Sequence, residues 1–187
     1  MKLRNARYLS RDIIDDIIQP GDTVVDATMG NGHDTLYLAQ KVGPQGRVYA
    51  FDVQQAALES TRKRLEENGC GDGRVQLILD SHARMADYVA GQPKCVLFNL
   101  GWLPTGDHNV TTQVTSTLQA VQAAMEITQP CGMISVCIYP GHEEGTREKH
   151  ALVEMLKHAD IRRYNILWCD FINQREDSPK VVLIQKE

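Results

Sequence analysis

Several features that define other classes of protein are missing from this sequence of 187 residues. It has no run of about 18 consecutive apolar residues, so no membrane-spanning helix is expected. Residues 1–10 are charged and lack the apolar segment of a secretory signal. The five cysteines are odd in number and show no C-x-x-C spacing. We therefore expect a cytoplasmic protein with reduced thiols that neither crosses a membrane nor is secreted.

Motifs of several enzyme classes are also missing. The chain contains neither the G-x-S-x-G of serine hydrolases nor the phosphate-binding loop of nucleoside triphosphatases. Position 146 is Thr146, so His142 does not begin an H-E-x-x-H zinc motif. The next two histidines, His150 and His158, follow at eight-residue steps that rotate each by about 80° around a helix, and we predict no metal site. The net charge of −4 argues against a protein that coats nucleic acid through bulk positive charge.

What the sequence does contain is an alternation of strand and helix patterns over a single domain, residues 1–187. The proportions of hydrophobic residues, 42%, and charged residues, 24%, are ordinary for a soluble globular protein. Short apolar, β-branched runs predict seven strands at 23–27, 47–51, 75–79, 95–98, 133–138, 164–168 and 181–184. Apolar stripes predict helices at 54–68, 111–128 and 146–158. An earlier helix, with Ser10 as its N-cap and an end before Pro20 and Gly21, is predicted by the apolar stripe Leu9, Ile13, Ile14, Ile17 and Ile18.

This alternation predicts an α/β fold with a mostly parallel sheet and helices on both faces. Residues 170–180 are polar and too few for a helical crossover, so the last strand is expected to run antiparallel as a hairpin. A seven-stranded sheet with an antiparallel end resembles the Rossmann-like sheet of class I methyltransferases. In such sheets a ligand binds beyond the carboxyl ends of the strands, so functional residues should follow each strand directly.

A glycine-containing loop follows the first predicted strand. Gly30 and Gly32 would let the backbone approach a ligand closely at the start of a helix. The dinucleotide-binding fingerprint requires a third glycine where the chain has Thr35. The methyltransferase pattern D-x-G-x-G-x-G fits better, since Asp26, Gly30 and Gly32 align and Thr28 replaces the first glycine. The alternative is a tight turn with no ligand.

Polar residues also follow the second and third predicted strands. Asp52, with Val53 and Gln54 after it, lies where a carboxylate would accept the ribose hydroxyls of a nicotinamide dinucleotide or of S-adenosylmethionine. The three residues Asp80, Ser81 and His82 could meet an adenine amine. In both places the alternative role is capping of the helix that follows.

The turn after the fourth predicted strand, residues 99–104, resembles the N-P-P-Y-like turn of amino-group methyltransferases. Asn99 is kept, Leu100 and Gly101 replace the prolines, and Trp102 replaces the tyrosine. Two acceptors, the Asn99 amide oxygen and the Leu100 carbonyl, would turn the lone pair of an amine toward a sulfonium methyl group. Trp102 would stack on a base or anchor the loop. After the fifth strand, Tyr139 would stack on a base or pack in the core.

Taken together, the motifs at 26–35, 80–82, 99–104, 139–142 and 172–174 resemble the bacterial family labelled putative rRNA methylase, over nearly the whole chain. Members of that family are tRNA methyltransferases that convert 5-aminomethyl-2-thiouridine at the wobble position to 5-methylaminomethyl-2-thiouridine. The resemblance implies S-adenosylmethionine as methyl donor and the tRNA anticodon arm as partner. It also implies cofactor contacts from Gly30, Asn31, Asp34, Thr35, Asp52, Gln54, Ser81 and His82.

An aliphatic amine must be neutral to accept a methyl group, so the site must lower its pKa or take its proton. Candidates are Asp26 and Asp107 as charged neighbours and His142 as proton acceptor. Cations that could meet tRNA phosphates lie at Lys2, Arg4, Arg7 and Arg11, at 62–64 and at 162–163, although such runs also occur as solvated faces. A homodimer could help to hold the anticodon arm.

Three alternatives remain at this stage. The chain could methylate an rRNA or a small amine. It could be an NAD-dependent oxidoreductase, which Asp52 permits but Thr35 and the Asn99 turn disfavour. It could also be a binding module that has kept the fold without catalysis.

Overall fold

The computed structural model describes residues 5–101 and 112–187, which form one seven-stranded sheet with helices packed on it. The strands are β1 (Thr23–Asp26), β2 (Arg47–Asp52), β3 (Val75–Leu79), β4 (Cys95–Asn99), β5 (Met133–Ile138), β6 (Tyr164–Cys169) and β7 (Lys180–Lys186). The helices are α1 (Ala6–Ile14), α2 (His33–Val42), α3 (Gln55–Glu67), α4 (Met85–Tyr88), α5 (Val114–Ile127) and α6 (Glu143–Lys157), with a short 3₁₀ turn, η1, at His82–Arg84. None of these helices is both long and apolar enough to cross a membrane.

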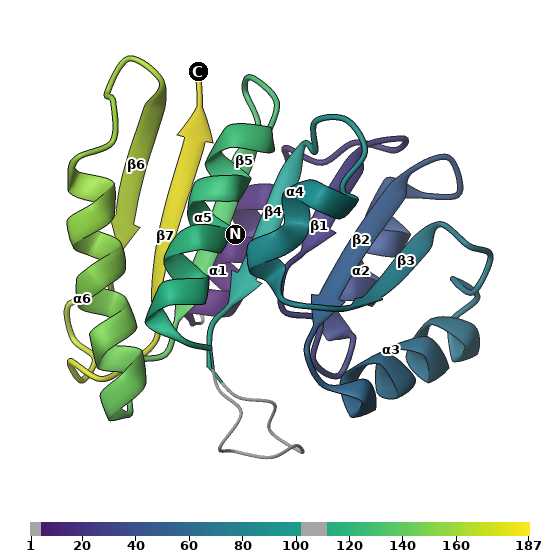
Figure 1. Cartoon of the computed structure of the whole chain (residues 1–187), viewed down its shortest axis with the longest axis horizontal. Coiled ribbons are helices and arrows are strands. Elements are labelled where there is room, and N and C mark those ends of the chain that lie inside the picture. Colours follow the sequence, from purple (N-terminus) through teal and green to yellow (C-terminus); the bar gives the residue numbers. More distant parts are fainter. Residues whose placement is uncertain (1–4, 102–111) are drawn as a thin grey trace.

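The strand order is β3-β2-β1-β4-β5-β7-β6, and the first five of these strands run parallel (Figure 1). β7 is inserted between β5 and β6 and runs antiparallel to both. All seven predicted strands and the antiparallel hairpin are therefore confirmed. The order also fixes where a ligand can bind, because it reverses between β1 and β4 and leaves a crevice beyond their carboxyl ends.

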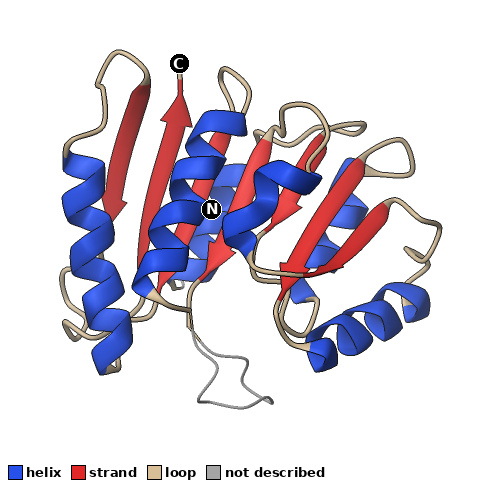
Figure 2. Ribbon diagram, viewed as in Figure 1, coloured by secondary structure: helices blue, strands red, loops and turns tan. Residues whose placement is uncertain are grey.

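Two apolar cores, one on each face, hold the helices to the sheet. Alternate residues of a strand point to opposite faces, so Val25 contributes to one core and Val24 to the other. The first core packs against α4, α5 and α6, and the second against α1, α2 and α3. Figure 2 shows these helices in front of and behind the strands. Helices on both faces were predicted from the sequence and are confirmed.

Several predicted helix limits differ from the structure: α1 ends at Ile14 and not near Ile18, α5 begins at Val114 and not at 111, and the starts of α1 and α6 are corrected as follows. α1 begins at Ala6 because the side chain of Asn5 caps it by accepting from the Tyr8 N–H at 3.1 Å. The predicted cap, Ser10, lies inside the helix, where its hydroxyl meets that of Ser135 at 2.6 Å. α6 begins three residues before the predicted start, since His142 caps it through a bond from the Gly145 N–H to Nδ1.

Candidate functional site

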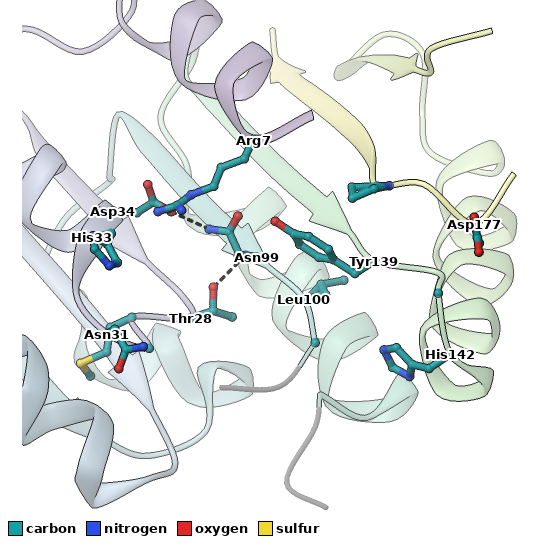
Figure 3. Close-up of a pocket in the computed structure, with 15 residues that line it drawn as sticks. Arg7, Thr28, Asn31, His33, Asp34, Asn99, Leu100, Tyr139, His142 and Asp177 are labelled. Atoms are coloured by element: carbon teal, nitrogen blue, oxygen red, sulfur yellow. Dashed lines mark hydrogen bonds and ion pairs between the residues drawn. The ribbon is translucent and has the colours of Figure 1, made fainter. Parts of the chain in front are cut away.

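A cavity of about 480 Å³ opens at the carboxyl edge of the sheet, between the ends of β1, β4 and β5 (Figure 3). Its volume lies in the usual range for small-molecule sites. Its wall comes from α1, the loop after β1, the start of α2, the turns after β4 and β5, and the loop before β7. The residues described along it are Arg7, Thr28, Met29, Gly30, Asn31, His33, Asp34, Asn99, Leu100, Gly101, Tyr139, Gly141, His142, Asp177 and Pro179.

The predicted glycine loop forms one side of this cavity. Gly32 has a φ of 76°, and a Cβ built on it would lie 2.8 Å from Thr61 Oγ1. Any other residue at this position would therefore be strained. The carbonyl of Gly30 accepts a bond from Thr61 Oγ1 at 3.1 Å, and that of Asn31 from Arg64 Nε at 2.7 Å. Helix α3 thus holds the loop in place at the mouth of the cavity.

Asp26 supports the loop from below and does not line the cavity. Its side chain is fully buried and accepts bonds from the Thr28 N–H at 3.1 Å and from Thr35 Oγ1 at 2.6 Å. Burial, together with the neighbouring charge of Asp34, raises the pKa of Asp26 to about 7. Of the two residues that it binds, Thr28 reaches the cavity wall and Thr35 is buried.

At the end of β2, Asp52 ties the glycine loop to the sheet. One carboxylate oxygen accepts from the Gly30 N–H at 3.1 Å and the other from the Gln54 N–H at 2.9 Å. Burial raises the pKa of this carboxyl. A carboxylate can accept roughly four hydrogen bonds, so acceptor positions remain for hydroxyl groups. Beside it, Val53 is 57% exposed and offers an apolar surface outside the cavity.

The three polar residues after β3 mainly hold their own turn. The Asp80 carboxylate accepts from the Ser81 N–H at 2.7 Å, from the Tyr88 hydroxyl at 2.6 Å and from Arg84. Ser81 caps η1 by accepting from the Ala83 N–H at 3.2 Å. These bonds are the capping role that was the alternative for this segment, and they leave the Ser81 hydroxyl hydrogen able to donate.

His82 is buried and joins this turn to β1. Its Nδ1 lies 3.0 Å from the carbonyl oxygen of Ala27, and its ring packs edge-on against Phe98. Burial lowers the pKa of His82, so the neutral ring donates from Nδ1 to this carbonyl. Like Asp80 and Ser81, it is not among the residues that line the cavity.

The turn after β4 is fixed through both main chain and side chain. The Asn99 N–H donates to Thr28 Oγ1 at 2.7 Å, and its side-chain Nδ2 donates to Asp34 Oδ2 at 2.9 Å (Figure 3). Leu100 is buried, and its N–H donates to the Cys137 carbonyl at 2.9 Å. Four predicted functional residues, Trp102, Asp107, Lys2 and Arg4, lie outside the described residues.

Two arginines of α1 meet Asp34 from the other side. Arg7 Nε donates to Asp34 Oδ2 at 3.1 Å, and Arg11 donates to Oδ1 through Nε at 2.6 Å and through its terminal nitrogen. Arg7, considered above as a phosphate contact, therefore lies in the cavity wall paired with a carboxylate. The sequence signal for this arrangement was the four-residue spacing of the two arginines, which places them on one face of a helix.

The far wall carries Tyr139, His142 and the loop before β7. Burial raises the pKa of Tyr139 to about 12, so its hydroxyl stays protonated at neutral pH. The loop contributes Asp177 and Pro179, which sequence analysis missed. An antiparallel β7 begins at the edge where the parallel strands end, so the predicted hairpin is the sequence signal that could have located them. In residues 5–101 and 112–187 no group of three or more His, Cys, Asp or Glu residues could hold a metal ion.

A sheet of this order with an antiparallel β7, a glycine loop after β1 and an Asn-containing turn after β4 defines a class I methyltransferase fold. The chain belongs to the family described as Putative rRNA methylase, which matches residues 48–185. A solved structure described as a putative rRNA-methylase from Clostridium thermocellum is 43% identical, with a TM-score of 0.97 and complete coverage of both chains.

Two further relatives bear on function. A structure described as a putative methyltransferase from Streptococcus mutans in complex with SAH is 34% identical, with a TM-score of 0.89 over the whole of both chains. The "tRNA (mnm(5)s(2)U34)-methyltransferase, chloroplastic" of Arabidopsis thaliana is 38% identical over an alignment of 164 residues that covers 81% of this chain. The chain spans 58% of the length of that plant protein.

Proposed function

We propose that this protein is an S-adenosylmethionine-dependent tRNA methyltransferase that converts 5-aminomethyl-2-thiouridine at the wobble position to 5-methylaminomethyl-2-thiouridine. The observation that carries the proposal is the position of Asn99. Its amide lies in the wall of one cavity together with the glycine loop on one side and Tyr139 on the other. The plant relative named for this nucleoside and the relative in complex with SAH support the proposal.

The residues after β1 and β2 fit the proposed donor. A loop with glycines at positive φ admits a ligand close to the backbone, and Asp52 keeps acceptor positions for two ribose hydroxyls. Exposed Val53 next to Asp52 offers an apolar face to an adenine ring, and the Ser81 hydroxyl offers a donor to one of its nitrogens. When bound, S-adenosylmethionine would supply a methyl group activated by its sulfonium.

The residues around the turn after β4 fit a primary amine as acceptor. Asn99 Oδ1 and the carbonyl of Leu100 would hold the two N–H bonds, so that the nitrogen lone pair lies in line with the methyl group. In the reaction the S–C bond breaks, an N–C bond forms and one proton leaves the nitrogen. The cations of Arg7 and Arg11 next to Asp34 favour the neutral form of the amine, whereas Asp177 in the same cavity wall acts in the opposite direction.

His142 remains a hypothesis for the group that takes this proton. Its Nδ1 already accepts a hydrogen bond from the Gly145 N–H at 3.2 Å, which places the proton of the neutral ring on Nε2. To act as a base at Nδ1, His142 would have to give up the cap of α6. A rate of methyl transfer that is unchanged in His142→Gln would remove it from the mechanism.

Tyr139 is proposed to stack on the wobble base or on its neighbour, since single-stranded loops of RNA are recognised mainly through unstacked bases on aromatic rings. The ring lines the cavity beyond Asn99, where a nucleobase carrying the amine would enter (Figure 3). The anticodon arm of tRNA is the proposed partner. We also propose that a homodimer helps to hold this arm, and sedimentation with and without tRNA measures the oligomeric state that tests it.

The direct test is transfer of a labelled methyl group from S-adenosylmethionine to tRNA that carries 5-aminomethyl-2-thiouridine, followed by nucleoside mass spectrometry. We expect a gain of one methyl group on that nucleoside. Asn99→Ala should slow single-turnover transfer about 100-fold, because the amine loses its orientation. Asn165→Ala makes the same chemical change on the exposed face of β6 and should leave the rate unchanged.

Other outcomes would identify the alternatives. Methylation of rRNA or of a small amine in place of this tRNA would keep the class of enzyme and change its substrate. A thermal shift with NAD and none with S-adenosylhomocysteine would contradict the methyltransferase assignment, since a ligand that binds the folded state raises its stability. Binding of S-adenosylhomocysteine with no transfer to any acceptor would indicate a binding module.

A further inference from the structure

The Asn99 side chain is the starting point, because an amide has two chemically different ends. Only its oxygen can accept an N–H bond from an amine, whereas its NH₂ group would oppose the N–H groups of that amine. A carboxamide that is free to turn over would present the wrong end for part of the time. The proposed orientation of the acceptor therefore requires that something fixes which end of Asn99 faces the cavity.

Asp34 supplies this selection. A carboxylate accepts hydrogen bonds and has none to donate, so it can pair only with the nitrogen end of the amide. The bond from Asn99 Nδ2 to Asp34 Oδ2 measures 2.9 Å, and Figure 3 shows the amide oxygen turned the other way, toward the side of Tyr139. The main chain of Asn99 is pinned separately by the bond from its N–H to Thr28 Oγ1.

Asp34 is itself held from a different part of the chain. Arg7 and Arg11 are 27 and 23 residues away in sequence, and their guanidinium groups bind its two carboxylate oxygens. The Asp34 side chain is only 8% exposed, and it lies in the first turn of α2, where the helix dipole favours a negative charge. Two guanidinium groups with several bonds leave this carboxylate little freedom to rotate.

The geometry points to Asp34 as a positioning residue for methyl transfer, which turns Asn99 Oδ1 toward the acceptor amine while Arg7 and Arg11 hold it in place. This inference rests on the proposed function, since it concerns the acceptor side of the same site. It also gives Asp34 a role different from the cofactor contact that the family resemblance implied. A contact with the donor and a grip on Asn99 predict different behaviour, so they can be separated.

The first measurement needs no substrate. In ¹⁵N-labelled protein the side-chain NH₂ resonances of Asn99, assigned by their loss in Asn99→Ala, report on the bond to Asp34. Asp34→Asn, which keeps the shape and removes the acceptor-only character, should shift these resonances and bring them closer to those of a solvent-exposed amide. Unmoved Asn99 resonances in Asp34→Asn would overturn the inference, whatever substrate the enzyme uses.

The second measurement is single-turnover methyl transfer at saturating S-adenosylmethionine, made once the wild type has been shown to methylate the proposed tRNA. Asp34→Asn should slow transfer about 100-fold. Its dissociation constant for S-adenosylhomocysteine should stay within about twofold of the wild type, because only the acceptor side is disturbed. A parallel loss of cofactor affinity that accounts for the lower rate would overturn the inference in favour of a donor contact.

Reversing the pair provides the control for folding and orientation. Asn99→Asp alone sets two carboxylates against each other and should be slow. In the double variant Asp34→Asn, Asn99→Asp the new amide donates to the new carboxylate, and an oxygen again faces the amine. In assays at a pH high enough to keep the amine neutral beside the new carboxylate, we expect the double variant to recover at least about tenfold over Asp34→Asn. A double variant as slow as the product of the two single effects would contradict a positioning role. Failure of the wild type to methylate this tRNA would instead refute the proposed function and leave the resonance test standing.

Discussion

The close packing between the glycine loop and α3 is testable with one methyl group, through Gly32→Ala. Gly32 has a φ of 76°, and its added Cβ would lie 2.8 Å from Thr61 Oγ1 and 2.9 Å from Thr61 Cα. A left-handed conformation costs an L-residue about 1–2 kcal/mol. The contact with Thr61 includes main-chain atoms that cannot turn away, and overpacking of this kind costs about 1–3 kcal/mol more. We therefore expect Gly32→Ala to lower the free energy of unfolding by about 2–5 kcal/mol.

Gly69→Ala is the matched control, because Gly69 has a similar φ of 69° and open space around the position of its Cβ. The free energy of unfolding of Gly69→Ala should fall only by the cost of the left-handed conformation, about 1–2 kcal/mol. Equilibrium unfolding in urea measures the free energy of unfolding of both variants, and the two values are compared with a common m-value. Equal losses in the two variants would show that α3 does not press on the glycine loop, and would refute the argument that this loop is held by Thr61.

Three further expectations concern buried or lining groups. The pKa of Asp26 is raised to about 7 in the folded protein from an ordinary 3.8, so the free energy of unfolding should fall as pH rises between these values, and Asp26→Asn should remove this part of the pH dependence in urea titrations. Glu148 is buried and its carboxylate accepts hydrogen bonds from two threonine hydroxyls, so Glu148→Ala should lower the free energy of unfolding by about 3 kcal/mol in the same assay. The control, Glu154→Ala at an exposed position of the same helix, should lower it by less than about 1 kcal/mol. If Tyr139 stacks on a base, Tyr139→Ala should raise the KM for tRNA about tenfold and Tyr139→Phe should not; equal effects of the two would point to the hydroxyl instead.

The strands could be predicted because their signals are local. Each is a short run of β-branched and apolar residues closed by turn residues, and the length of the segment before β7 sufficed to predict its direction. The start of α1 was wrong for a local reason too. Asn5 and Ser10 are both good helix caps, and Ser10 is instead drawn into the helix, where its hydroxyl meets that of Ser135. That contact joins residues 125 positions apart, which no local pattern contains.

In the candidate site, too, features with a local sequence signal could be predicted and features that depend on long-range contacts could not. The loops after β1, β2 and β4 were identified because the fold requires functional residues directly after parallel strands. The pairing of Arg7 with Asp34 depends on how α1 docks beneath the sheet, and a row of cations at the start of a chain is indistinguishable from an exposed patch until that docking is known. For the same reason the capping role of Ser81 and the buried position of His82 emerged only from the three-dimensional arrangement.

The position of β7 between β5 and β6 has a consequence for folding during synthesis on the ribosome. β5 is buried along its whole length and pairs on one side with β7, and β6 pairs only with β7, yet β7 is the last of the described strands to be synthesised. Until residues 180–186 emerge, the nascent chain carries two open strand edges, one of them almost entirely apolar. Such edges are templates for pairing with other chains. A stall or premature stop shortly before residue 180 should therefore yield aggregates, although the glycine loop, α1 and the Asn99 turn would all have been made.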